Sequence, residues 1–171
     1  MDTNRLREEL EIDEGVKYEV YKDHLGFATI GYGHLVKPHE HFIKDKKYDR
    51  KVLEKIFNYD VTIAIQDSKK LFEGIENEEV IEIIAHMCFQ LGRPKTAKFV
   101  KMFEAIRNKD YIEAGLQMED SLWARKHTPA RASRLAEQMK KLTWENIEKG
   151  LLHQKKYKRY MIIEKNIKRK I

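Results

Sequence analysis

Helical periodicity through the middle of the chain restricts its fold more than any other feature. Between about residues 49 and 72, apolar side chains recur every three or four positions, which predicts one long helix. The next segment starts at Glu76-Asn77 and is apolar almost all round until Gly92 and Pro94 end it. That pattern is typical of a helix at the centre of a core. The chain is therefore expected to be mainly helical.

A short helix is expected at the N-terminus, before the long one. Leu6 and Leu10 are spaced to lie on one of its faces, and Glu14 continues that face. Gly15 is placed to end the helix in a left-handed conformation, which glycine adopts without steric cost. Glu14 is thereby expected at the C-terminal end of a helix, on its apolar side.

Two antiparallel strands are expected after this helix. Residues 17–23 and 27–34 have strand-like patterns, and Gly26 allows a turn between them. Gly31 and Gly33 weaken the second strand, so a bend or a close approach of the backbone is expected there. A sheet this small is not stable alone, so it is expected to pack on helices.

The C-terminal half is expected to be helical. Two short helices are predicted over 98–108 and 110–120. Thr128 followed by Pro129 is a typical helix start, because threonine caps the first turn and proline fits its first position. Thr143 is placed to cap one further helix.

Composition excludes several classes of protein. A hydrophobic content of 42% is that of a globular chain. The single cysteine, Cys88, lies in an apolar run, so no disulfide within the chain is possible and a buried core thiol is expected. No apolar run reaches the length of a membrane span, and the charged N-terminus has no apolar signal core. We therefore expect synthesis and folding in a reducing cytoplasm.

The net charge of +6 is concentrated near the C-terminus. Residues 150–171 carry eight Lys and Arg against one Glu, which leaves the rest of the chain almost neutral, without a basic face for nucleic acid. Two alternatives stay open for this tail: it binds an anionic envelope surface as a basic amphipathic helix, or its apolar face packs on the helical body. The apolar positions at helical spacing are Tyr160, Ile163, Ile167 and Ile171.

Together these elements predict an α+β, mainly α fold with two lobes. Residues 1–59 are expected to form a small N-terminal lobe with a short antiparallel sheet, and the helix over about 49–72 to connect it to a larger helical lobe over 60–149. Residues 150–171 form the basic tail. A cleft between the lobes is the expected place for a functional site.

Three polar residues around the hairpin have the pattern of paired acid and base catalysis. Glu14 lies on the apolar side of a helix end, where the dipole and burial both favour the neutral acid that a general acid must be. Asp23, beside a turn, is expected to stay ionised, and Thr29 lies across the hairpin, where its hydroxyl can hold a water. Each has an ordinary alternative: a surface glutamate, a turn-forming aspartate and a β-branched strand residue.

Their combination resembles the active-site signature of the T-even phage lysozymes. Asp23 is the ninth residue after Glu14, and Thr29 is the sixth after Asp23, within "EGVKYEVYKDHLGFATIGYGH". Further segments resemble that family in the same order: "TIGYGHLV", "KIFNYDV", "HMCFQLG", "SLWARKHTPARASR" and "TW". The resemblance covers most of residues 6–145.

The resemblance implies a lysozyme-like fold and a muramidase, which hydrolyses the β-1,4 bond from N-acetylmuramic acid to N-acetylglucosamine in bacterial peptidoglycan. It implies Glu14 as the general acid, Asp23 as the base that activates the attacking water, and Thr29 as a residue that positions this water. The family is inverting, which requires carboxyl groups roughly 6.5–9.5 Å apart. Because water is the nucleophile, the resemblance implies neither a metal nor a cofactor.

Substrate contacts carry over from the family unevenly. Leu35 and Phe89 match the family's residues at sugar-contact positions. Met102 and Gln117 stand where the family often has serine and asparagine. We therefore expect the sugar contacts at these two positions to differ.

Three supporting residues complete the expected site. Arg131 in "TPARASR" matches an arginine near the catalytic glutamate, where its charge would oppose the effect of burial on Glu14. His34 follows the hairpin and Asp60 lies on the long helix, so a pair between them would tie the sheet to that helix. Such a pair would raise the pKa of His34.

The loop over 38–49 departs from the family pattern, because it is shorter than the usual connection. We expect the shorter loop to widen the cleft and to alter substrate preference. Within it, His39, Glu40 and His41 are expected to form a solvated polar tip. The seven histidines of the chain show no spacing typical of metal ligands.

A different class of function stays open beside the enzyme. On that alternative the protein is a non-enzymatic helical module whose basic C-terminus binds an anionic membrane or nucleic acid. The intact trio of Glu14, Asp23 and Thr29 favours the enzyme. For the enzyme we expect a monomer that acts on peptidoglycan strands and not on nucleic acid. Like a phage endolysin, it would be made in the host cytoplasm and reach the periplasmic wall after a holin opens the inner membrane.

Overall fold

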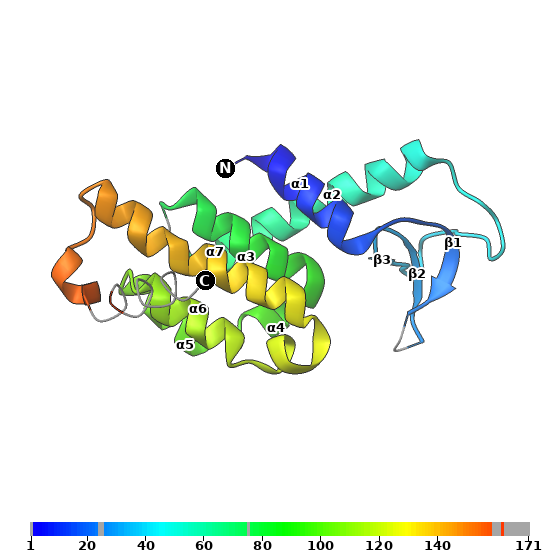
Figure 1. Cartoon of the computed structure of the whole chain (residues 1–171). Coiled ribbons are helices and arrows are strands. Elements are labelled where there is room, and N and C mark those ends of the chain that lie inside the picture. The colour runs from blue at the N-terminus through cyan, green and yellow to red at the C-terminus, as the bar shows by residue number, and fades with distance from the viewer. Residues whose placement is uncertain (1, 24–25, 75, 159–161, 163–171) are drawn as a thin grey trace. The chain divides into compact units, whose positions relative to one another are not determined.

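The computed structural model describes residues 2–23, 26–74, 76–158 and 162 of the chain. It is mainly helical with one small antiparallel sheet near the N-terminus, which confirms the predicted fold class (Figure 1). The chain divides into two compact units, Met1–Lys98 and Phe99–Ile171. The lobe boundaries expected from the sequence, at residues 59 and 149, stay predictions.

Helix α1 (Thr3–Glu14) has the ends that the sequence predicts. The carboxylate of Asp2 caps its first turn, and Gly15 ends it with a φ of 62°. Leu6 and Leu10 are fully buried on the predicted apolar face. The helix therefore carries Glu14 at its last position, directly before the sheet (Figure 1).

The sheet consists of β1 (Lys17–Lys22), β2 (Ala28–Gly31) and β3 (His34–Leu35), paired in that order. The prediction of one strand over 27–34 is wrong, because β2 ends at Gly31 and a turn precedes β3. Gly31 and Gly33 have φ values of 64° and 86°, which a regular strand does not contain. The bend expected from these glycines is therefore present and divides the strand into two.

The three remaining helices of the first unit are α2 (Arg50–Leu71), α3 (Glu78–Leu91) and α4 (Arg93–Thr96). Asp49 caps α2 and Asn77 caps α3, each through its side-chain oxygen. Gly92 ends α3 with a positive φ, and Pro94 lies in the first turn of α4. Both long helices thus begin and end close to where their periodicity predicts.

The core of the first unit joins α1, the sheet, α2 and α3. The ring of Tyr32, in the turn after β2, lies against Phe57 of α2 with 4.5 Å between centroids. This contact anchors the turn on the long helix. The buried members of the cluster are Leu6, Leu10, Ile30, Tyr32, Leu53, Phe57, Val61 and Ala85.

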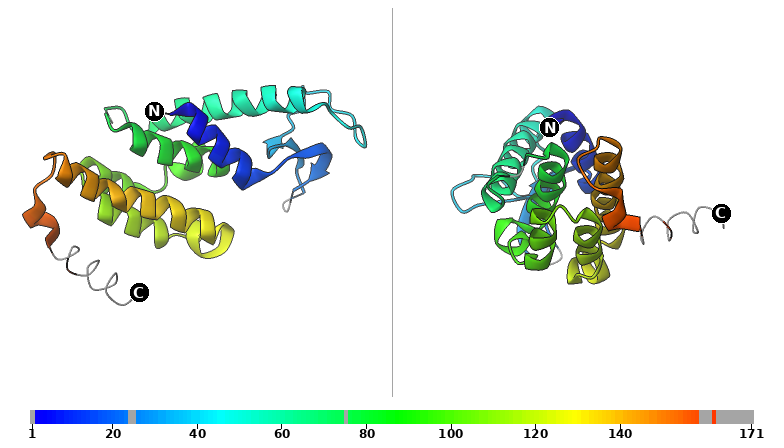
Figure 2. Two further views of the ribbon diagram at one scale, coloured as in Figure 1. Left: turned by 45° about the horizontal axis from the view of Figure 1, so that its top comes forward. Right: turned by 90° about the vertical axis from the view of Figure 1, so that its left-hand side faces the viewer.

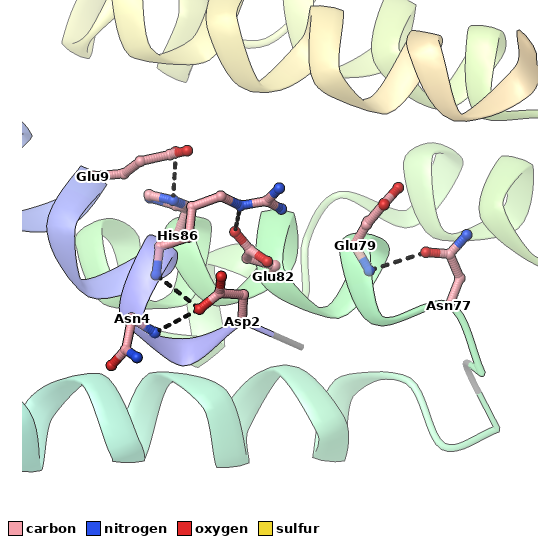
Figure 3. Close-up of polar contacts among 8 residues, drawn as sticks. Asp2, Asn4, Glu9, Asn77, Glu79, Glu82 and His86 are labelled. Carbon is pink, nitrogen blue, oxygen red and sulfur yellow. Dashed lines mark hydrogen bonds and ion pairs between the residues drawn. The ribbon is translucent and has the colours of Figure 1, made fainter. Parts of the chain in front are cut away.

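An ion pair and a histidine–carboxylate contact connect α1 with α3 beside this core (Figure 3). Nε of Arg5 donates to Oε1 of Glu82 at 2.8 Å, and Oε2 of Glu9 lies 3.2 Å from Nε2 of His86. Glu82 and His86 are buried on α3, whereas Arg5 is about half exposed. Polar groups removed from water in this way require partners, so the pairs hold α1 in place.

The described part of the second unit is helical. Its elements are α5 (Val100–Arg107), α6 (Tyr111–Glu119), a π-helical turn η1 (Trp123–His127), α7 (Pro129–Glu148) and a 3₁₀ turn η2 (Gln154–Tyr157). Within this unit α6 and α7 lie side by side (Figure 2). Asp110 caps α6. Helix α7 begins after Thr128 with Pro129 in its first turn, as predicted, but the Thr128 side chain does not make the expected capping hydrogen bond.

The prediction that Thr143 caps a further helix is wrong. Thr143 is fully buried inside α7, which continues without a break to Glu148. Met139, Leu142 and Asn146 are buried on the same helix, before and after Thr143. Because burial at helical spacing continues across Thr143, no new helix start is needed there.

Residues 150–158 follow α7 in the second unit. Tyr157 is fully buried, and its hydroxyl donates to the carbonyl of Lys109 at 2.7 Å. The amphipathic face predicted for the tail, at Tyr160, Ile163, Ile167 and Ile171, lies outside the described residues. Among the residues that are described, no helix is long and apolar enough to cross a membrane.

Candidate active site

The end of α1 brings Glu14 against the turn that follows β2. A Cβ atom on Gly33 would lie 3.4 Å from Oε2 of Glu14 and 3.9 Å from its Cδ. The half-buried carboxyl group therefore rests on the bare backbone of a glycine. The close backbone approach expected in this segment is confirmed, and the group that makes it is Glu14.

The backbone of Phe27 orients both other residues of the predicted trio. Oδ1 of Asp23 accepts a hydrogen bond from the N–H of Phe27 at 2.8 Å. Oγ1 of Thr29 donates to the carbonyl of the same residue at 3.1 Å. A hydroxyl that donates once can still accept, so the buried oxygen of Thr29 is suited to accept a hydrogen bond from a bound water.

Asp23 also has the ordinary role of a turn-forming residue. Its N–H donates to the carbonyl of Phe27, and its own carbonyl accepts from the N–H of Gly26, both at 2.9 Å. The turn-forming role of Asp23 is therefore compatible with its expected role as the base. The turn fixes the backbone of Asp23, and the bond to Phe27 fixes the direction of its carboxylate.

Tyr21 is a residue of this site that the sequence analysis missed. It pairs with Thr29 across β1 and β2. Burial raises the pKa of its phenol, and the negative charges of Glu14 and Asp23 raise it further. Both carboxylates are thus close enough to act on one phenol. Its place opposite Thr29 depends on strand register, which the sequence does not fix.

His34 has two carboxylate partners. Its Nδ1 lies 2.7 Å from Oδ2 of Asp60, so the predicted contact is present. Its Nε2 lies 3.0 Å from Oε2 of Glu40, which also accepts from the N–H of Lys37 at 2.7 Å. The expectation that Glu40 belongs to a solvated tip is therefore wrong, because its carboxylate turns back toward His34. The hydrogen bond to Asp60 raises the pKa of His34; burial lowers it, Glu40 raises it again, and the net change is upward.

A pocket of about 350 Å³ adjoins this cluster in the first unit. Its lining includes Leu35 and Phe89, the two predicted sugar-contact residues of that unit, together with Lys37, Asp67 and Cys88. Leu35 is 51% exposed, so it offers an apolar surface to a ligand. Burial raises the pKa of Cys88 to about 12, and its thiol is therefore the unreactive core group that the sequence predicts.

Met102, Gln117 and Arg131 belong to the second unit. Met102 is fully buried in α5, and the amide of Gln117 donates to Glu113 at 2.7 Å. Arg131 is buried in the first turns of α7. Substrate contacts at Met102 and Gln117, and the effect of Arg131 on Glu14, stay predictions.

The first unit thus presents two carboxylates on separate backbone supports, a hydroxyl beside one of them, and a pocket with an apolar wall. Such a set is suited to acid and base chemistry on a polar polymer. Across the described ranges, no group of three or more His, Cys, Asp or Glu side chains is arranged to hold a metal ion.

Comparison with known proteins agrees with this chemistry. The phage lysozyme family model matches residues 11–141. Two proteins of Dictyostelium discoideum, described as probable T4-type lysozymes 2 and 1, are 32% and 26% identical to the chain over 158 and 155 residues. Each alignment covers 76% of this chain and 90% of the relative. The pre-baseplate central spike protein Gp5 of Enterobacteria phage T4 is 30% identical over 155 residues, and this alignment covers 76% of this chain and 26% of Gp5.

Proposed function

Because the chain belongs to the phage lysozyme family and is a lysozyme-type hydrolase, we propose that it cleaves the β-1,4 bond between N-acetylmuramic acid and N-acetylglucosamine in peptidoglycan. In this proposal Glu14 is the general acid, Asp23 is the general base and Thr29 helps to position the attacking water. Family membership also favours the enzyme over the alternative of a non-enzymatic helical module.

One arrangement supports these roles above the others. Asp23 and Thr29 both bond to the backbone of Phe27, and Glu14 lies against Gly33 in the turn after the strand that carries Thr29. Glu14 and Asp23 thus reach this hairpin from a helix end and from a strand end. Their supports differ as the two roles require: the half-buried carboxyl of Glu14 rests on Gly33, and that of Asp23 is held by a backbone N–H. Different surroundings are the usual means by which two carboxyl groups acquire an acid and a base role.

The proposed reaction is a single displacement at the anomeric carbon. Glu14 donates its proton to the glycosidic oxygen as the bond to the anomeric carbon breaks. Asp23 takes a proton from a water on the opposite face of the sugar while that water forms the new bond. Thr29 accepts a hydrogen bond from the same water. The products are two shorter glycans, and one of them carries a reducing-end muramic acid with inverted configuration.

The test uses Glu14→Gln and Asp23→Asn with purified peptidoglycan, and mass spectrometry of the released fragments. Each replacement keeps the shape of the side chain but removes its acid–base function, so turnover should fall on the order of 10²–10⁴-fold. Glu8→Gln, at an exposed position of the same helix, is the matched control and should retain activity. Near-normal turnover by a folded Glu14→Gln protein would reject the assignment. Anhydro-muramic ends or free peptides from the wild type would reject the muramidase.

We also propose that the enzyme acts as an endolysin, made in the host cytoplasm and active on the wall after release. The basic tail is the candidate for attachment to an anionic envelope surface. Tyr157 is buried, so truncation after Lys149 would damage the second unit, whereas truncation after Lys158 keeps that contact. We expect the latter truncation to weaken sedimentation with envelopes at low salt without changing turnover on soluble fragments. Unchanged sedimentation would remove the tail from the proposal.

A further inference from the structure

His34 has surroundings that a neutral imidazole cannot satisfy. Its two ring nitrogens face carboxylate oxygens, Nδ1 at 2.7 Å from Asp60 and Nε2 at 3.0 Å from Glu40. An ionised carboxylate only accepts hydrogen bonds, so each nitrogen has to carry a proton. A neutral imidazole carries one N–H and would leave one of these contacts as two facing lone pairs. The geometry therefore selects the imidazolium.

The place of His34 in the chain links this charged group to the active site. Gly33, the residue before it, supports the carboxyl group of Glu14. Leu35, the residue after it, pairs with Thr29 across β2 and β3. A displacement of His34 would therefore move the supports of both the proposed acid and the proposed water-binding residue.

Glu40 brings the loop after β3 into the same arrangement. Its carboxylate bridges the N–H of Lys37 and the ring of His34. Farther along the loop, the N–H of Tyr48 donates to the carbonyl of Tyr18 in β1 at 2.9 Å. Both contacts attach the loop to the sheet, and Glu40 makes its attachment next to the turn that contains Gly33.

We propose that Glu40 is a positioning residue of the active site: with Asp60 it holds His34 in the charged form and so keeps the Gly33 turn in place against Glu14. The proposal rests on the proposed function, because Glu14 is the proposed acid. Its consequence is that loss of the His34 proton loosens the turn. The catalytic rate then falls at alkaline pH, while substrate affinity changes little.

The charged surroundings of His34 are consistent with this role. Burial raises the pKa of Glu40, but the bonds from the Lys37 N–H and from His34 outweigh burial and lower it, so Glu40 stays ionised across the working range. Of the titratable groups in this cluster, the imidazole of His34 has the ordinary pKa nearest to neutrality. The titratable side chains that line its pocket or contact its turn are Lys37, Glu40, Asp60, Asp67, Cys88 and Glu14.

The test is Glu40→Gln, with kcat and KM measured on soluble peptidoglycan fragments from about pH 5 to pH 9, and with an NMR titration of His34. Glutamine keeps the length and an accepting oxygen but carries no charge. We expect near-normal kcat at the acid end, where His34 is charged in both proteins. We expect the alkaline fall of kcat to move to lower pH, with a several-fold loss near pH 8 and little change in KM. The NMR titration of His34 should move by the same amount.

Two further variants distinguish the effect of the contact between Glu40 and His34 from a general effect of charge. Glu54→Gln removes a carboxylate of α2 that is bonded to Arg50 instead of His34, and it should keep the wild-type pH profile. Glu40→Asp keeps the charge but shortens the reach, so a smaller shift is expected. The measurements are repeated near 1 M salt, where charges are screened over about 3 Å. A shift of the alkaline limb that is caused by the hydrogen bond between Glu40 and His34 should persist there.

Several results would overturn the proposal. One is an unchanged alkaline limb in folded Glu40→Gln. Another is a limb that moves while the His34 titration does not, since that result assigns the shift to the effect of charge on Glu14. If Glu40→Gln does not fold, Glu40→Asp decides by the same two readouts. Failure of the proposed function is recognised separately, because the fragments released by the wild type then lack reducing-end muramic acid. The NMR titration still tests whether Glu40 holds His34 in the charged form.

Discussion

Two buried histidines of the first unit show two different uses of a contact between an imidazole and a carboxylate. His34 is 7% exposed and lies in a strand of two residues, after a glycine with positive φ. His86 is 1% exposed and lies in the regular helix α3, with Glu9 of α1 beside it (Figure 3). The first contacts helix α2 through Asp60 and the loop after β3 through Glu40, and the second contacts helix α1 through Glu9. The first therefore fixes the turn between β2 and β3 against α2 and the loop, and the second fixes how two helices pack.

Helix α1 connects the two sites. It carries Arg5 and Glu9, which contact α3, and its last residue is Glu14, which rests on Gly33. A defect at the α1–α3 contact should weaken the fold as a whole. A defect at the Gly33 turn should displace one carboxyl group and leave most of the fold unchanged. The comparison therefore predicts that stability and activity can be lost separately.

The largest effect is expected from Gly33→Ala. The new methyl group would lie 3.4 Å from Oε2 of Glu14, and alanine is strained at a φ of 86°. A catalytic group moved by about 1 Å can lose on the order of 10²-fold in rate, so turnover should fall by about that factor. The measurement is kcat on soluble fragments, together with urea unfolding.

Gly74→Ala is the matched control for this prediction. Gly74 has a φ of 92°, and a Cβ atom there would meet nothing within 4 Å. Both variants should lose roughly 1–2 kcal/mol of stability from the strained backbone, but only Gly33→Ala should lose activity. Equal loss of turnover in the two proteins would contradict the proposed support of Glu14 by Gly33.

An intermediate effect is expected from Arg5→Met, in stability and not in activity. The substitution leaves the carboxylate of Glu82 buried without the guanidinium that it now contacts. That should lower the free energy of unfolding by about 1–3 kcal/mol. Turnover per folded molecule should stay close to that of the wild type. Adding Glu82→Met removes the buried charge and should restore part of the stability.

The contrast between the α1–α3 contact and the Gly33 turn fails if Arg5→Met lowers kcat as strongly as Gly33→Ala does. Such a result would mean that the α1–α3 contact also sets the position of Glu14. Urea unfolding and kcat measured on the same preparations distinguish the two outcomes.

Most of the helical fold could be predicted from the sequence, because the helices combine periodic burial with clear ends. Helices α2 and α3 begin near the predicted residues, where Asp49 and Asn77 cap them, and Gly15 and Gly92 end α1 and α3 as their positions predict. Thr143 is the exception. A threonine is as suitable for a cap as for a buried place within a helix, and only tertiary packing decides between them.

The candidate site was predictable only in part. Family resemblance singles out Glu14, Asp23 and Thr29, and the pair of His34 with Asp60 follows from their expected elements. Glu40 and Tyr21 were not singled out. The loop that carries Glu40 has no periodicity from which a contact with His34 could be read. The role of Tyr21 depends on strand register, which a hairpin of unknown turn geometry does not fix.

The smallest effect is expected in how stability depends on pH, measured on Asp60→Asn. The hydrogen bond to Asp60 is the main cause of the raised pKa of His34. A group whose pKa is raised on folding stabilises the protein fully below its unfolded value, about 6.5 for histidine, and this stabilisation is lost as pH rises through the folded value. The difference in unfolding free energy between wild type and Asp60→Asn should thus be largest near pH 5.5 and shrink above neutrality. The change is small because a neutral imidazole can still donate one hydrogen bond to residue 60. Urea unfolding at half-unit steps from about pH 5 to pH 9 measures it. A difference that stays constant across this range would mean that His34 is not charged in the folded state, and the contrast with His86 would lose its basis.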